Sequence, residues 1–164
     1  MGNALKDQGK LDEAIDAYKN SISLKSDYAF AYNNMATALK KQDKLEDSLV
    51  FYNKAILLKP DFAEAYNNMG VTLRNQGKLK DAIDAFKKAI SLNPNDSQTY
   101  NNLGNVYQAQ GKLEEALRHW IKSAKLKPQD DKFVIGLAHN LCYIKTVSDR
   151  IIFDSSFIHF TIEP

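Results

Sequence analysis

The histidines and the cysteine are the first residues to consider for chemistry. The chain has three histidines, His119, His139 and His159, and a single cysteine, Cys142. His139 and Cys142 lie three residues apart, a spacing that puts two side chains on one face of a helix. A zinc site takes four ligands, and the neighbouring sequence supplies no others. We therefore expect no metal site, and surface or packing roles for these residues.

The sequence contains no motif that is typical of another class of enzyme. The glycines at Gly9, Gly77 and Gly111 are isolated, whereas a phosphate-binding loop needs several close together. The acidic residues collect where helices are predicted to begin, and the helix dipole explains them there. We expect a chain that is not an enzyme and binds no cofactor.

Composition narrows the class of protein further. The net charge of +2 over 164 residues is too small to predict nucleic-acid binding. No apolar run approaches the roughly 18 residues of a membrane span, and no signal peptide is recognisable. The lone cysteine can form no internal disulfide. A cytoplasmic protein with no nucleic-acid and no membrane partner is the expectation.

Paired amides offer a different chemistry, that of binding. The stretch AYNNM occurs at Ala31 and again at Ala65, and TYNNL occurs at Thr99. Asparagine is a poor helix former, about 0.6 kcal/mol worse than alanine, so six of them in helices need a reason. An amide carries a donor and an acceptor together, which suits the backbone of an extended peptide. The alternative is that the amides bond to one another and join neighbouring elements.

A period of 34 residues positions these amides. Pro60, Pro94 and Pro128 are 34 residues apart, and Tyr32, Tyr66 and Tyr100 keep the same interval. A fixed period of this size is typical of a solenoid, in which each repeat buries its apolar face against the next. We number positions within the unit from Ala63 as position 1.

Each unit reads as two helices. In the unit that begins at Ala63, Tyr66, Met69, Gly70 and Leu73 form one apolar stripe, Gly77 interrupts it, and a second stripe begins at Leu79. Small residues recur at position 8 and bulky rings at position 24, where the two helices must approach closely. The position-8 residues are Gly2, Ala36, Gly70 and Gly104, and the position-24 residues are Tyr18, Tyr52, Phe86 and Trp120.

This pattern resembles the tetratricopeptide repeat. The resemblance implies an all-α fold, an α-solenoid of stacked antiparallel helix pairs. It is clearest over residues 29–130, with repeats at 29–62, 63–96 and 97–130. Residues 1–28 fit as a truncated repeat, because Met1 falls at position 7. Asp43 replaces the turn glycine, and aspartate tolerates the left-handed conformation better than most residues.

The C-terminal residues depart from the repeat. Val134, Leu137, Ala138 and Leu141 continue the first-helix stripe, so residues 131–146 are expected to form a capping helix. Residues 147–164 lose the pattern, and we expect an irregular tail packed on the cap. A strand of a further domain and a disordered end are the alternatives.

The helical period separates two faces of the first helix. Positions 5 and 6 lie about 100° and 200° from position 4, away from the core. Position 6 resembles the asparagine ladder in the superhelix of O-linked N-acetylglucosamine transferases, which implies that it contacts a substrate backbone. Position 5 (Asn33, Asn67 and Asn101) is expected to be structural. The predicted peptide-binding residues are Asn34, Asn68, Asn102 and Asn105, with Lys6, Lys40 and Arg74 at position 12 as a row of positive charge.

Three functions are compatible with these sequence patterns. The first is a protein–protein interaction module that holds an extended, acidic peptide segment in its concave groove. The second is a substrate-recognition piece of a larger enzyme such as a glycosyltransferase. The third is a scaffold that self-associates through the ends of the array.

Overall fold

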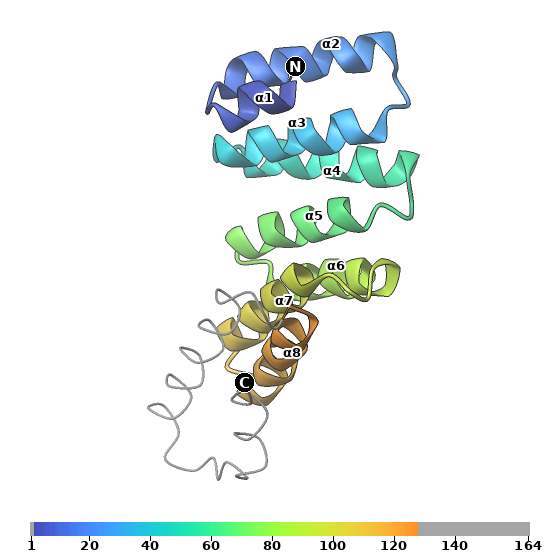
Figure 1. Ribbon diagram of the computed structural model, residues 1–164. Coiled ribbons are helices and arrows are strands. Elements are labelled where there is room, and N and C mark those ends of the chain that lie inside the picture. The colour runs from blue at the N-terminus through green and yellow to red at the C-terminus, as the bar shows by residue number, and fades with distance from the viewer. Residues whose placement is uncertain (1, 128–164) are drawn as a thin grey trace.

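The computed structural model describes residues 2–127, which form eight α-helices and no strand. The helices stack side by side in chain order (Figure 1). The first helices of the units are α1 (Gly2–Asp7), α3 (Ala29–Lys41), α5 (Ala63–Asn75) and α7 (Ser97–Ala109). The second helices are α2 (Leu11–Leu24), α4 (Leu45–Leu58), α6 (Leu79–Leu92) and α8 (Leu113–Leu126). The predicted all-α solenoid of helix pairs is confirmed for this part of the chain.

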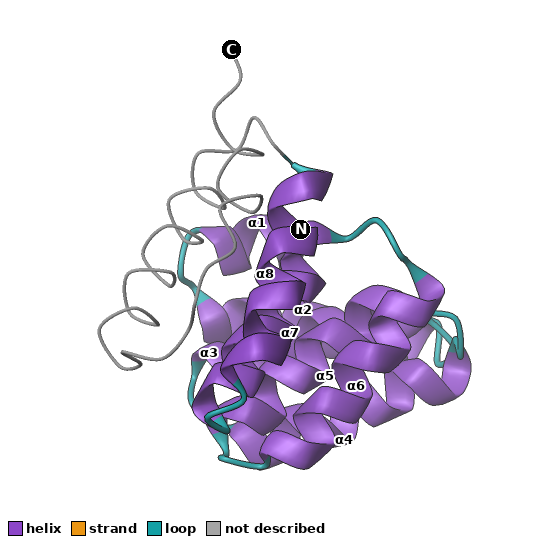
Figure 2. Cartoon of the chain, turned by 90° about the horizontal axis from the view of Figure 1, so that it is seen from below, coloured by secondary structure: helices purple, strands orange, loops and turns teal. Residues whose placement is uncertain are grey.

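Each pair is joined by a turn that needs a left-handed residue. Gly9, Gly77 and Gly111 have φ of 78°, 75° and 73°, a conformation that glycine adopts without steric cost. Asp43 takes the same place in the second pair with φ of 60°, as the sequence predicted. The short loops gather at the two ends of the helices (Figure 2). The turn therefore keeps the two helices of a unit antiparallel and in contact.

Close approach within each pair depends on position 8. A Cβ added at Gly104 would lie 2.5 Å from Cδ1 of Trp120, and one at Gly70 would lie 2.7 Å from Cε1 of Phe86. Both rings are almost wholly buried. The glycine and the ring thus fill one shared volume, which confirms the predicted packing.

The core runs as a series of clusters between successive helices. One cluster contains Tyr18 and Met35, a second contains Tyr32 and Phe62, and a third contains Phe86 and Leu103. Each draws on adjacent units, so the repeats are held together by apolar contacts along the whole stack. No helix of the described part is long and apolar enough to cross a membrane. The predicted capping helix 131–146, the tail 147–164, His139, Cys142 and His159 lie outside the described residues.

Candidate functional site

The first helices bring the asparagine pairs of successive units together. Nδ2 of Asn68 donates to Oδ1 of Asn33 at 3.3 Å, and Nδ2 of Asn102 donates to Oδ1 of Asn67 at 3.0 Å. In both cases position 6 of one unit bonds to position 5 of the unit before it. The amides of Asn68 and Asn102 therefore join neighbouring repeats, as the alternative interpretation had it.

Further hydrogen bonds occupy some of the remaining donors and acceptors of the asparagine side chains. Asn33 is 1% exposed and donates from Nδ2 to Oε1 of Glu64 at 3.1 Å, so position 5 is structural in this unit. Asn102 also accepts from Nε2 of Gln98 at 3.2 Å. Each amide has two N–H donors and two acceptor lone pairs. Asn68 and Asn102 thus retain one N–H each, and Asn68 retains its carbonyl oxygen as well.

Asn34 differs from the other two members of the row. It is half-buried at the same position of its unit, yet its side chain makes no hydrogen bond to any described residue. Both donors and the acceptor of Asn34 are therefore available.

Asn105 makes a contact that the sequence did not predict. Its Oδ1 accepts a hydrogen bond from Nε1 of the buried Trp120 at 3.0 Å. The same relation holds between position 9 and position 24 in two other units, where Tyr18 donates to Asn3 and the hydroxyls of Tyr52 and Thr37 lie 3.1 Å apart. The carbonyl oxygen of Asn105 thus serves the packing of its own helix pair.

The three cations at position 12 lie near one another on successive first helices. Burial lowers the pKa of Lys40, and the charges of Arg74, Lys41 and Lys6 lower the pKa further. None of the three cations of the row pairs with a carboxylate within residues 2–127. The structure therefore brings Lys6, Lys40 and Arg74 together as one row, which we call the cation row.

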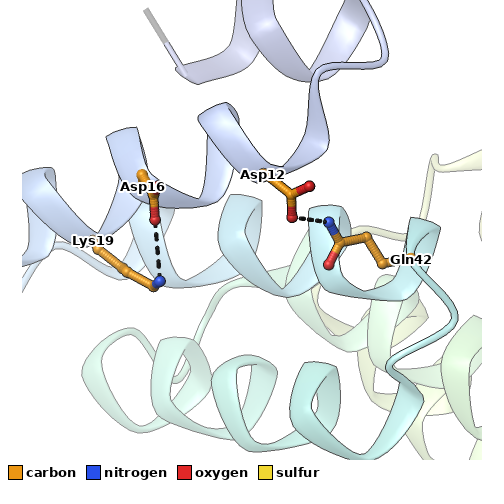
Figure 3. Close-up of polar contacts among 4 residues, drawn as sticks. All are labelled: Asp12, Asp16, Lys19 and Gln42. Atoms are coloured by element: carbon orange, nitrogen blue, oxygen red, sulfur yellow. Dashed lines mark hydrogen bonds and ion pairs between the residues drawn. The ribbon is translucent and has the colours of Figure 1, made fainter.

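Sequence reasoning missed a second set of contacts between units. Nε2 of Gln42 donates to Oδ1 of Asp12 at 2.7 Å (Figure 3), and Nε2 of Gln76 donates to Oε1 of Glu46 at 3.0 Å. The glutamine is at position 14 of one unit, and the acid is at position 18 of the unit before it. A glutamine at every position 14 was a visible signal, but it lies at a helix end outside the apolar stripe.

A cavity of about 340 Å³ lies beside this contact, between α2 and α4. Its apolar part comes from Ile15, Met35, Leu39 and Phe51. Its rim carries three aspartates and two lysines, of which Asp16 and Lys19 form an ion pair at 3.1 Å (Figure 3). The mixed charge of the rim favours no one kind of ligand.

His119 is the one histidine within residues 2–127, and its ring packs against two tyrosines. His119 stacks on Tyr107, with ring centroids 5.3 Å apart, and also on Tyr100 at 6.1 Å. Burial lowers its pKa, with Lys87 acting in the same direction and Glu115 opposing it. Among residues 2–127 no three His, Cys, Asp or Glu side chains gather as a metal site. The contacts with Tyr100 and Tyr107 give His119 a packing role between its own helix and α7.

Comparison with protein families agrees with this geometry. The family described as tetratricopeptide repeat matches residues 29–62 and 63–96, and related repeat families match residues 2–43 and 85–118. Together these matches span more than half of the chain. The chain belongs to the tetratricopeptide repeat family.

Several solved structures share the tetratricopeptide fold of the chain. A crystal structure of MamA is 24% identical, with a TM-score of 0.74, and the match covers 85% of this chain and 82% of that one. A thermophilic repeat protein of Thermus thermophilus, TTC0263, is 21% identical, with a TM-score of 0.78, over 86% of this chain and 78% of that one. The first repeat domain of Spaghetti (RPAP3), bound to the HSP90 peptide SRMEEVD, is 28% identical, with a TM-score of 0.65, over 67% of this chain and 87% of that one. No curated protein sequence matches the chain.

Proposed function

We propose that this repeat array is a protein-interaction module whose first-helix face holds an extended, acidic peptide segment. Its family and fold are those of interaction modules, and one similar structure carries the peptide SRMEEVD, which contains three acidic residues. The groove and the acidic preference are the part that we add. They rest on the cation row together with the free capacity of the amides.

The cation row is the observation that carries the proposal. Burial is the larger cause of the lowered pKa of Lys40, and the charges of Arg74, Lys41 and Lys6 lower it further, because like charges held close together raise one another's free energy. A carboxylate placed beside Lys6, Lys40 and Arg74 would relieve this repulsion. Because no described acid pairs with them, an acidic ligand has no internal competitor there.

The amides would fix the backbone of the same peptide. Asn34 has all of its hydrogen-bonding groups available, and Asn68 and Asn102 retain part of theirs. Asn105 would contribute through its NH₂ group, since its carbonyl oxygen accepts from Trp120. Desolvated amide contacts of this kind set the bound lifetime, whereas exposed charges set the encounter rate.

A random linear peptide library selected on the immobilised protein tests the proposal. We expect enrichment of peptides rich in Asp and Glu on the wild-type chain, and loss of that enrichment on the Lys40→Glu/Arg74→Glu variant. The matched control is Lys54→Glu/Lys88→Glu, which makes the same charge change at exposed positions of α4 and α6. Equal enrichment on both charge-reversed variants would refute the assignment to the cation row.

A selected peptide then separates charge from amide contacts. Charge reversal at Lys40 and Arg74 should weaken binding most at low salt, because both charges are partly exposed and salt screens such charges with a Debye length of about 10 Å at 0.1 M. Asn34→Ala should instead speed dissociation at every salt concentration, at a cost of about 1 kcal/mol for each hydrogen bond lost. Surface plasmon resonance at several salt concentrations measures both. A salt-independent loss in the charge-reversed variant would contradict the distinction.

A further inference from the structure

The cation row has one member on each of three successive first helices. Lys6 is on α1, Lys40 on α3 and Arg74 on α5, each at position 12 of its unit. Because α3 is stacked between α1 and α5 (Figure 1), Lys40 is the middle member, and the charges of both other members act on it. The distance from one member to the next therefore decides which acidic peptides can reach all three at once.

The hydrogen bonds between units show that this distance is regular. The bond from position 14 to position 18 of the unit before joins the first unit to the second and the second to the third. The bond from position 6 to position 5 of the unit before joins the second unit to the third and the third to the fourth. The units thus follow one another with the same displacement. Since packed helices lie about 8–10 Å apart between their axes, the cations of successive first helices are about that far apart as well.

One peptide conformation has this spacing. The polyproline II helix has three residues per turn and rises about 3.1 Å per residue, so side chains three residues apart share one side at about 9 Å. In a β-strand, side chains two residues apart share one side at about 7 Å, and side chains three apart point to opposite sides. In an α-helix, neighbours on one face are only about 5–6 Å apart. A polyproline II segment therefore places one side chain against each cation.

The amides beside the cation row favour the same conformation. Positions 5 and 12 lie on one face of the first helix, two turns or about 10 Å apart, so the amide bonds run parallel to the cation row. A polyproline II backbone makes no internal hydrogen bonds, so its N–H and C=O groups are open to side-chain amides. Asn68 retains one N–H and its carbonyl oxygen for such contacts. A helical ligand would satisfy its own backbone groups and leave this capacity unused.

We propose that the ligand of the cation row is a polyproline II segment with an acidic side chain at every third residue, in the pattern E-x-x-E-x-x-E. The inference rests on the proposed function, because it names the class of acidic peptide that the same face would hold. The row ends at Gln108, the position-12 residue of α7. Three acids therefore complete the pattern, and a fourth would meet no cation.

Three isomeric peptides test the spacing. The glutamates are three residues apart in ESQESQE, two apart in ESEQESQ and adjacent in EEESQSQ, and each peptide has blocked ends and a fluorescein label. Fluorescence anisotropy at low salt should show that ESQESQE binds the whole chain about three to ten times more tightly than either isomer, because misplaced acids lose exposed ion pairs. Equal affinity, or tighter binding of an isomer, would overturn this inference and leave an acidic groove intact.

The charge-reversed variants assign the preference to the cation row. It should disappear on Lys40→Glu/Arg74→Glu and persist on the control Lys54→Glu/Lys88→Glu. A preference that survives reversal of Lys40 and Arg74 would overturn the inference. Failure of all three peptides to bind at millimolar concentration would overturn the proposed function together with it.

Extending the row gives a test in the opposite direction. Gln108→Lys adds a fourth cation, and Glu114→Gln makes the same charge change at an exposed position of α8. Gln108→Lys should bind ESQESQESQE about threefold or more tightly than ESQESQESQQ, through one added ion pair. The wild-type chain and Glu114→Gln should distinguish these peptides by no more than about twofold, the statistical gain of a second register. No gain in Gln108→Lys, or an equal gain in Glu114→Gln, would overturn the inference.

Discussion

The ring at position 24 and the residue at position 9 are matched in polarity in every described unit. Tyr18, Tyr52 and Trp120 carry a polar ring group and face Asn3, Thr37 and Asn105, respectively. Phe86 carries none, and position 9 of its unit is Val71. A buried polar group left without a partner costs about 1–3 kcal/mol, which explains the matching.

A double-mutant cycle at Thr37 and Tyr52 checks this explanation. Tyr52→Phe and Thr37→Val should each destabilise the chain by about 0.5–1.5 kcal/mol, because each removes the hydrogen bond between the two hydroxyls, while Thr37 keeps its bond to the carbonyl oxygen of Asn33 and Tyr52 keeps its bond to Thr72. The double variant copies the Val71–Phe86 pair, so it should lose less than the sum of the two. Urea denaturation of the four proteins gives the coupling free energy. Strict additivity would mean that the two hydroxyls do not depend on each other.

The same tyrosine should make stability fall in alkali. Burial raises the pKa of Tyr52 to about 12, with Glu64 acting in the same direction and the hydrogen bonds to Thr37 and Thr72 opposing it. Because the unfolded chain releases this proton near pH 10, the stability that Tyr52 contributes is complete below pH 10 and is lost as the pH rises to 12. Two pKa units correspond to about 2–3 kcal/mol. The difference in unfolding free energy between wild type and Tyr52→Phe, followed from pH 9 to pH 12, should shift by this amount.

At the scale of the helices, the asparagines of one row have unequal structural roles. Asn102 bonds to Asn67 and Gln98, whereas Asn34 makes no side-chain hydrogen bond to the described residues. Asn102→Ala should therefore destabilise the chain by about 1 kcal/mol or more, the value of one or two hydrogen bonds. Asn34→Ala should leave stability unchanged or raise it slightly, since alanine is the better helix former. Thermal denaturation of the two variants measures this difference. An equal fall in melting temperature in both variants would contradict the unequal roles of the two asparagines.

The sequence predicted the helix pairs because their signals are local. The apolar stripe, the left-handed residues Gly77 and Asp43, and the small residue at Gly104 each act within one unit, where spacing along the chain determines proximity. The partners of Asn68 and Gln42 belong to a neighbouring unit. Their contacts depend on how far one helix pair is displaced along the next, and residue spacing does not determine that displacement. The bond from Trp120 to Asn105 was missed for a different reason: residue spacing shows which face Asn105 lies on, but not that the indole N–H of Trp120 lies within its reach.

At the scale of the whole molecule, the glutamine contacts between units are incomplete. Gln42 and Gln76 each donate to an acidic residue at position 18 of the preceding unit. For Gln110 the residue at position 18 of the preceding unit is Lys80, which is not an acceptor. Oε1 of Gln110 is buried without a partner, and no described residue accepts from its side chain. The α7–α8 pair therefore lacks the glutamine–acid contact that joins each of the two preceding pairs to the unit before it.

Lys80→Glu should supply the missing acceptor. We expect slower amide hydrogen exchange in α7 and α8, with local stability raised by about 0.5–1.5 kcal/mol, the net value of one hydrogen bond. Lys88→Glu, which makes the same charge change at another exposed position of α6, is the control and should leave exchange unchanged. If hydrogen exchange in α7 and α8 slowed equally in both variants, the change in net charge, and not a new hydrogen bond to Gln110, would be the cause.

The bonds Asn68–Asn33 and Asn102–Asn67 are the same contact at two successive levels of the stack. This bond therefore requires only an asparagine at position 5 of one unit and an asparagine at position 6 of the next. A duplication of residues 63–96 would place a new position 6 against an existing position 5. An array of this kind can therefore gain or lose whole units of 34 residues and keep the amide bond between neighbouring units.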